Sequence, residues 1–356
     1  MTWMPPTWAR RIVLGPLVIV AAVGMLALTP LWLLVALALT SLVPGRFRLP
    51  RVLWLVTVYL LWDAMLVIAM FALWIASGFG YAIRRPGFVT AHYRLGAWGL
   101  RLLFWVFGGV LRLTITTTGA DDEDSAGRAD FDSLFAAGTP LIVASRHGGP
   151  GDSFILIHTL LNEVARRPRI VLKYTLQWDP AIDILLHRVP AQFIVPSGFG
   201  GARRGGGARV EEALARLATG LGPEDAFVIF PEGGNVSAAR RTSRIQRLRA
   251  AGRVQMAERA EALRHVMAPQ PGGMHAALTA APGADVVFIA HTGLDRLVTL
   301  RDIWRELPMD KGIAMRAWRV ARSDIPEDLD AQAAWLFDWF ARIDAWIDAH
   351  PDAPVR

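Results

Sequence analysis

The sequence contains no cysteine, and charged residues are scarce. Without cysteine the chain has no disulfide framework and no thiolate zinc site, and its redox compartment stays undetermined. Charged residues make up 19% of the 356 residues, whereas 53% are hydrophobic. Soluble domains carry about 25% charged residues, so much of the apolar surplus must face something other than water.

Lysine is also nearly absent. The net charge of +7 is carried by 36 arginines and only two lysines, Lys173 and Lys311. So high a ratio of arginine to lysine is typical of genomic base composition rather than of selection for guanidinium chemistry. The positive sign still favours anionic partners such as a phospholipid surface, a phosphorylated substrate or a nucleic acid.

Two long apolar runs lie near the N-terminus. Residues 12–45 contain no charged residue, and residues 52–83 contain only Asp63. About 20 apolar residues suffice to cross a bilayer, so each run predicts a helical membrane segment. Pro30 could divide the first run into two half-helices. Spanning and re-entrant segments both stay open, and both place the rest of the chain on the side of the N-terminus.

Residues 99–110 carry Arg101 among aromatic and aliphatic residues, which predicts an interfacial helix lying on the bilayer. We therefore expect a membrane anchor over residues 1–111 and a soluble domain over residues 112–356. In the second part, short buried runs alternate with helical patterns, which predicts an α/β fold with a largely parallel sheet flanked by helices. Strands are expected near 112–118, 141–145, 170–173, 191–195, 227–230, 286–290 and 314–320, and helices near 153–166, 209–219 and 255–265.

A polar, glycine-rich turn at residues 145–152 follows the predicted strand 141–145. His147 can act as a general base near neutral pH, and Asp152 lies far enough along the turn to fold back onto the ring. Catalytic groups of open α/β sheets gather at the carboxyl ends of strands, which favours this turn as a site. A simpler interpretation stays open, in which Asp152 only caps the next helix and His147 is an ordinary loop residue.

A second turn, Phe-Pro-Glu-Gly-Gly at residues 230–234, follows another predicted strand. Proline fixes one backbone angle and glycine permits positive ones, which leaves Glu232 and free amides at the end of the strand. An ordinary turn explains the proline and the glycines but not the acid. Residues 233–257 then contain six arginines and no acidic residue, so they predict either an anion-binding segment or a solvated basic loop.

The two turns, in this order, resemble the motifs of the glycerolipid acyltransferases, the family that includes 1-acylglycerol-3-phosphate (lysophosphatidic acid) acyltransferase. The first motif of that family is a His and an Asp separated by four residues, which His147 and Asp152 match. Its second hallmark is Phe-Pro-Glu-Gly, matched by residues 230–233. Further segments are similar to the branch of lysocardiolipin and lysophosphatidylinositol acyltransferases, and the resemblance covers residues 112–350. Those segments are residues 171–180, 193–194, 265–274 and 325–344.

The chain departs from the family pattern around both motifs. Arg146 stands where the family usually has Asn, Gly149 where it has Ser, and Gly234 where it has Thr. The Arg expected just after residues 193–194 is also absent. These departures concern the acceptor lipid more than the reaction.

The resemblance implies an O-acyltransferase that moves a fatty acyl group from acyl-CoA or acyl carrier protein to the hydroxyl of a lysophospholipid, in phospholipid synthesis or remodelling. We expect no metal, no cofactor beyond the thioester co-substrate, and no nucleic-acid partner. We expect contact with an anionic membrane surface, and a cytoplasmic catalytic domain at the cell membrane. The expected catalytic residues are His147 and Asp152, and the expected substrate-binding residues are Arg146, Lys173, Arg203, Arg204, Glu232, Gly233, Gly234, Arg240 and Arg241.

Two alternatives stay open. The segment 151–153 suggests a lipid esterase with Ser153 as nucleophile, although Asp348 and His350 lack the spacing that such an esterase uses, and a GxSxG elbow is absent. The other alternative is a catalytically inactive membrane protein with an acyltransferase-like fold. The presence of both His147 and Glu232 argues against it.

Overall fold

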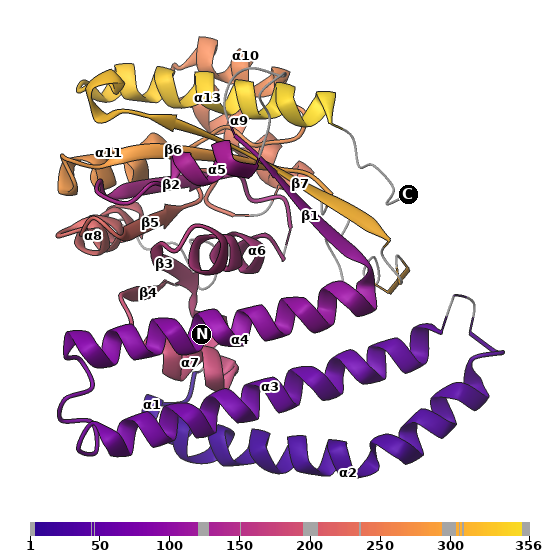
Figure 1. Cartoon of the computed structure of the whole chain (residues 1–356). Coiled ribbons are helices and arrows are strands. Elements are labelled where there is room, and N and C mark those ends of the chain that lie inside the picture. Colours follow the sequence, from indigo (N-terminus) through magenta and orange to yellow (C-terminus); the bar gives the residue numbers. More distant parts are fainter. Residues whose placement is uncertain are drawn as a thin grey trace. The chain divides into compact units, whose positions relative to one another are not determined.

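A sheet of seven strands, mostly parallel, organises the chain, and the predicted α/β class is confirmed (Figure 1). The strand order is β1-β7-β6-β2-β5-β3-β4. β2 pairs in parallel with both β5 and β6, and β3 with β5, whereas β7 runs antiparallel to β6. The strands are β1 (Leu113–Thr118), β2 (Leu141–Ser145), β3 (Arg167–Lys173), β4 (Ala191–Ile194), β5 (Asp225–Ile229), β6 (Asp285–His291) and β7 (Lys311–Val320).

The computed structural model describes residues 4–43, 45, 47–119, 128–149, 151–194, 206–234, 236–293, 304–305, 307 and 310–350. Its α-helices are α1 (Thr7–Ala9), α2 (Gly15–Leu39), α3 (Arg48–Ala76), α4 (Pro86–Leu111), α5 (Arg128–Leu134), α6 (Asp152–His158), α7 (Pro180–Leu186), α8 (Gly206–Ala218), α9 (Ala238–Ala250), α10 (Val254–Ala262), α11 (Pro271–Ala280) and α13 (Leu329–Ala349). Short π-helical turns are η1 (Arg10–Leu14) and η3 (Thr159–Glu163), and short 3-10 turns are η4 (Tyr174–Trp178) and η5 (Arg322–Asp324).

Both faces of the sheet are covered. Every residue of β2 is buried, as expected for a continuous apolar strand with helices on each side. On one face, Phe288 of β6 stacks on Trp339 of α13, with ring centroids 4.6 Å apart. On the other face, Met315 of β7 accepts a hydrogen bond from Thr159 of η3 at 3.8 Å. Strand alternation therefore places odd and even positions of β6 in different helical layers.

The predicted helices near 153–166, 209–219 and 255–265 correspond to α6 with η3, to α8 and to α10. The arginine-rich segment differs from the solvated loop that the sequence left open, because residues 238–250 form the helix α9. Ser237 caps this helix by accepting a hydrogen bond from the N–H of Arg240 at 3.4 Å. Five of the six arginines therefore lie on one helix that follows the second turn in the sequence.

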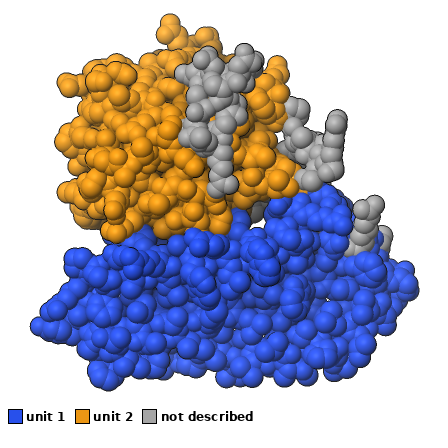
Figure 2. Space-filling model, in the orientation of Figure 1, with its two compact units in different colours: residues 1–113, 171–206, 303–310 blue, residues 114–170, 207–302, 311–356 orange. Residues whose placement is uncertain are grey.

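The chain forms two units, which are coloured separately in Figure 2. The first comprises residues 1–113, 171–206 and 303–310, and the second comprises residues 114–170, 207–302 and 311–356. The first unit therefore combines the N-terminal helices with α7 from the middle of the chain. The predicted division into residues 1–111 and 112–356 stays a prediction about domains, and the two structural units interleave along the sequence.

Three helical segments of the first unit, Thr7–Leu39, Arg48–Ala76 and Pro86–Leu111, are long and apolar enough to cross a membrane. They indicate membrane association. The helix expected at residues 99–110 is the C-terminal half of α4, which makes α4 a candidate span rather than only an interfacial segment. Pro30 lies inside α2 and does not end it, and Figure 1 shows α2 curved along its length.

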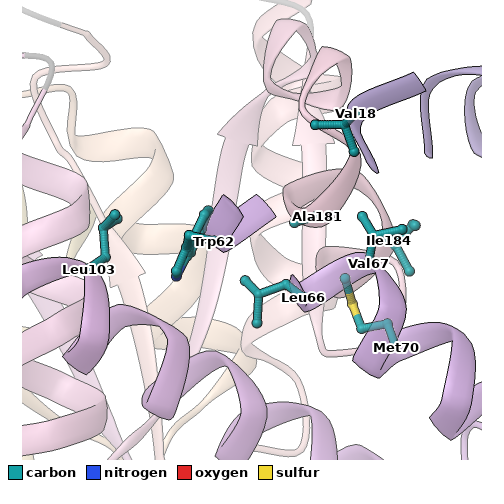
Figure 3. Packing of buried hydrophobic residues seen from close by; sticks show 8 residues of the cluster. All are labelled: Val18, Trp62, Leu66, Val67, Met70, Leu103, Ala181 and Ile184. Carbon is teal, nitrogen blue, oxygen red and sulfur yellow. The ribbon is translucent and has the colours of Figure 1, made fainter. Parts of the chain in front are cut away.

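An apolar core joins α7 to the N-terminal helices within the first unit (Figure 3). Side chains from α2, α3, α4 and α7 meet in this core, and α3 contributes half of them. Because α7 is only seven residues long, packing rather than helix propensity must hold it in place. The buried members are Val18, Trp62, Leu66, Val67, Met70, Leu103, Ala181 and Ile184.

Three carboxylates add two hydrogen bonds and an ion pair between α7 with its N-cap and the N-terminal helices. Asp63 of α3 accepts a hydrogen bond at 2.8 Å from the first turn of α7. Asp179, the N-cap of α7, accepts a hydrogen bond from the hydroxyl of Tyr59. Asp183 forms an ion pair with Arg10 at 2.9 Å. The acidic residue inside the second apolar run therefore has a role in helix packing.

Candidate active site

The structure brings His147 and Asp152 together. The side chain of His147 is 14% exposed, and its ring lies against that of Phe230 with centroids 4.7 Å apart. Its buried Nδ1 atom lies 3.5 Å from Asp152 Oδ2. This contact is longer than an ordinary hydrogen bond, as catalytic contacts often are before substrate binds. Because Nδ1 faces the carboxylate, Nε2 is the nitrogen that can take a proton from a substrate.

Asp152 is the first residue of α6, and its buried carboxylate turns back toward the preceding loop. The N-cap position belongs to Gly151, so Asp152 does not cap the helix. Asp152 Oδ2 accepts a hydrogen bond from the N–H of Gly149 at 2.5 Å. Burial raises the pKa of Asp152, but the nearby His291, the contact with His147 and the Gly149 N–H outweigh burial and leave this pKa below its ordinary value. The carboxylate is therefore ionised near neutral pH.

A second histidine, His291, which the sequence did not single out, also reaches Asp152. Its Nε2 atom lies 3.7 Å from Asp152 Oδ2. A lone histidine at the end of an apolar run carries no pattern of its own. Only the parallel pairing of β2 with β6, which aligns Ser145 with Ile289, places His291 beside the histidine turn.

Arg146 lies beneath the turn and is almost fully buried. Its Nη1 donates a hydrogen bond to the carbonyl of His291 at 3.0 Å. Its guanidinium lies so close to Gly148 that any side chain at that position would collide with it. Arg146 thus supports the turn from inside, and its expected contact with substrate stays a prediction.

Glu232 binds the backbone of the turn that carries His147. Its carboxylate is fully buried, with Oε1 accepting the N–H of His147 at 2.8 Å and Oε2 accepting the N–H of Met267 at 3.0 Å. Burial raises the pKa of Glu232, against the effect of these two hydrogen bonds and of the neighbouring Arg146. Its expected role in substrate binding stays a prediction, because both oxygens are already occupied by protein donors.

The glycines of the second turn are required by its backbone. Gly233 and Gly234 have φ values of 68° and 150°, which side-chain-bearing residues rarely adopt. The guanidinium of Arg240 lies over Gly234, so that a Cβ there would come 2.5 Å from Nη1. Arg241 points elsewhere and donates to two backbone carbonyls within residues 264–266. Of these two arginines, Arg240 is the one beside the turn.

The remaining expected site residues are not joined to this cluster. Lys173 is the exposed last residue of β3 and belongs to the first unit, whereas the two turns belong to the second. Arg203 and Arg204 lie outside the described residues. Within the described part of the chain, the Ser153 hydroxyl has no hydrogen bond to a histidine, and no group of three or more His, Cys, Asp or Glu side chains could hold a metal ion.

A histidine base with a carboxylate partner, placed among backbone amides, is suited to removing a proton from a hydroxyl while that oxygen attacks a carbonyl. Residues 128–292 match the family model Acyltransferase. The matched segment contains both turns and also His291. It supports an acyltransferase activity in general and is consistent with the glycerolipid acyltransferases. No curated protein matches the chain.

Proposed function

We propose that this acyltransferase moves a fatty acyl group from acyl-CoA or acyl carrier protein to the hydroxyl of a lysophospholipid such as 1-acylglycerol-3-phosphate. The observation that carries the proposal is the pair of His147 and Asp152. An ionised, buried carboxylate stands behind an imidazole that is partly exposed. A pair of this kind is suited to a hydroxyl acceptor, because an alcohol is a poor nucleophile until its proton is removed.

In the proposed reaction, His147 Nε2 takes the proton of the acceptor hydroxyl as the oxygen attacks the thioester carbonyl. Asp152 keeps the ring oriented and stabilises the imidazolium, as the acid of a serine-protease triad does. Amides of the glycine-rich turns stabilise the negative oxygen of the tetrahedral intermediate. Collapse breaks the carbon–sulfur bond, and the imidazolium returns its proton to the leaving thiolate. The lipid oxygen itself is the nucleophile, so no acyl-enzyme forms.

The lipid acceptor is supported by the apolar helices and by Arg240. Three candidate membrane helices bring the chain to the bilayer, where lysophospholipids reside. Arg240, which lies over Gly234, offers a guanidinium to the phosphate of an anionic headgroup. We further propose that the catalytic domain faces the cytoplasm at the cell membrane, with the anionic bilayer surface attracting the basic helix α9.

The decisive experiment incubates the purified full-length protein with labelled acyl-CoA or labelled acyl carrier protein and a panel of lysophospholipids in vesicles. We expect labelled diacyl product with at least one anionic acceptor. Thioester consumption without any lipid product would reject the lysophospholipid. A labelled acyl group trapped covalently on Ser153 would favour the esterase alternative instead.

The assignment of Arg240 is tested separately, with the acceptor that the panel identifies. We expect Arg240→Gln to raise the acceptor KM about tenfold with little change in kcat, because a lost phosphate contact weakens binding before the chemical step. Arg249→Gln is the matched control, since Arg249 lies on the same helix and forms an ion pair with Glu261 at 2.6 Å. Equal KM values in both variants would remove Arg240 from the acceptor site.

A further inference from the structure

Three groups converge on one oxygen of Asp152. The N–H of Gly149 lies 2.5 Å from Oδ2, His147 Nδ1 lies 3.5 Å from it, and His291 Nε2 lies 3.7 Å from it. The other oxygen, Oδ1, is buried and has no hydrogen-bond partner among the described residues. The orientation of the carboxylate therefore depends on the groups that meet at Oδ2.

His291 is held firmly enough to serve as one of these groups. It is the last residue of β6, a strand paired on both sides, and only 5% of its surface is exposed. Its carbonyl accepts a hydrogen bond from Arg146 at 3.0 Å. The following residue, Thr292, donates its N–H to the carbonyl of Ala314 in β7 at 2.9 Å. The backbone that carries the His291 ring is thus held by the sheet.

Asp152 is an acidic neighbour of the His291 ring. The Nε2 atom of His291 lies 3.7 Å from Asp152 Oδ2 and 3.4 Å from the backbone carbonyl of Arg146, so both oxygens face the same nitrogen. Met315 of β7, which pairs with His291, and Thr159 of η3, which contacts Met315, are uncharged. Among the influences that lower the pKa of Asp152 against its burial, the charge of His291 is the largest.

We propose that His291 is a positioning residue for acyl transfer, which holds Asp152 Oδ2 in place so that Asp152 can orient the ring of His147. This inference rests on the proposed roles of His147 and Asp152. His291 acts through the carboxylate and does not contact substrate. A proton on Nε2 is sufficient for this role, since that nitrogen is the one that faces Asp152.

The kinetic test compares two replacements of His291. His291→Leu removes the donor and should lower kcat about tenfold with the acceptor KM unchanged, a coupling typical of neighbouring side chains. His291→Gln keeps an N–H donor and should restore most of the activity. His275→Leu is the matched control, because His275 lies in the same unit and bonds to Gln332 instead, at 2.9 Å. A Gln variant as impaired as the Leu variant, with equal thermal unfolding, would overturn the proposal.

A double-mutant cycle then asks whether His291 acts through Asp152. In an Asp152→Asn background, His291→Leu should cause no further loss of kcat, because the carboxylate that it positions is already gone. The same tenfold loss in both backgrounds would mean that His291 acts independently, and it would overturn the proposal.

A measurement without substrate separates this inference from the proposed function. In protein labelled with ¹⁵N-histidine, the ring signals of His147, assigned with a His147→Ala variant, should shift when His291 is replaced by Leu. They should not respond to that replacement in the Asp152→Asn background. Absence of acyl transfer by the wild-type protein would reject the proposed function alone. Unchanged His147 signals in both backgrounds would reject the proposal that His291 acts on His147 through Asp152.

Discussion

The two turns at the carboxyl edge of the sheet differ in what they do with their acidic residue. The histidine turn leaves an imidazole 14% exposed and backs it with Asp152, whose pKa lies below its ordinary value. The glutamate turn buries Glu232 completely, raises its pKa and commits both oxygens to backbone N–H groups. Residues of two adjacent motifs thus divide into one group suited to proton transfer and one suited to holding the first in place.

The glutamate turn is itself fastened to the C-terminal helix. Glu232 holds the N–H of Met267, and the residues just before Met267 are held by Asp344 of α13, which accepts the N–H groups of residues 264–266 at 2.6 to 3.0 Å. A hydrogen bond to a charged group contributes about 1.5–3 kcal/mol. The position of His147 is therefore linked through Glu232 to an element about 200 residues farther along the chain.

The comparison is tested most strongly at His147. We expect His147→Ala to lower kcat by about 10² to 10⁴, because the variant lacks the imidazole that takes the proton of the acceptor hydroxyl. Thermal unfolding should change little, since the ring is partly exposed. The measurement is acyl transfer at saturating acceptor beside a melting curve. Near-wild-type transfer by a folded variant would contradict the assignment of the base.

Glu232→Gln, unlike His147→Ala, should lower the stability of the fold as well as kcat. The amide cannot accept from both His147 and Met267, so one buried N–H would face another donor, at a cost of about 1–3 kcal/mol in the free energy of unfolding. Denaturant titration measures this loss, and kcat should fall because the backbone of His147 is released. If the acceptor KM rose instead while stability stayed the same, Glu232 would belong to the substrate-binding site.

The smallest expected effect concerns acid stability. Because the folded pKa of Asp152 lies below its ordinary value of 3.8, this carboxylate stabilises the fold above that pH. The stabilisation is lost as the pH falls through the lower folded pKa. Asp152→Asn should therefore flatten the decline of stability below about pH 4, as followed by melting temperature. A decline as steep as that of wild type would show that Asp152 gains nothing from folding.

Much of the sheet could be predicted because its strands are continuous apolar runs. β2 and β5 are bounded by turn residues and buried on both faces, and that pattern is visible in the sequence. Helix α9 was harder to predict, because its many arginines leave too few apolar residues to form a recognisable helical pattern. The start of α4 was missed because His92 and Arg94 interrupt the apolar pattern, although His92 is fully buried.

The site was predictable only in part. His147 and Asp152 lie close in sequence, so a short turn sufficed to predict their meeting. The place of His291 depends on the pairing of β6 with β2, and the two partners of Glu232 come from residues 85 and 35 positions away. Such tertiary relations leave no local signal. The pair of His147 and Asp152 could therefore be predicted from the sequence, whereas the residues that support the pair could not.

The contacts that join α7 to the N-terminal helices affect how the protein folds during synthesis and where it can be truncated. The N–H that binds Asp63 belongs to Ala181, and the carboxylate that pairs with Arg10 belongs to Asp183. These contacts cannot form until more than a hundred residues beyond α3 have been synthesised. Unpaired charge is costly at membrane depth. A fragment that ends at residue 111 would keep that cost, and a fragment that begins at residue 112 would expose the apolar side of α7 around Ala181 and Ile184. Truncation between residues 111 and 112 should therefore destabilise both fragments.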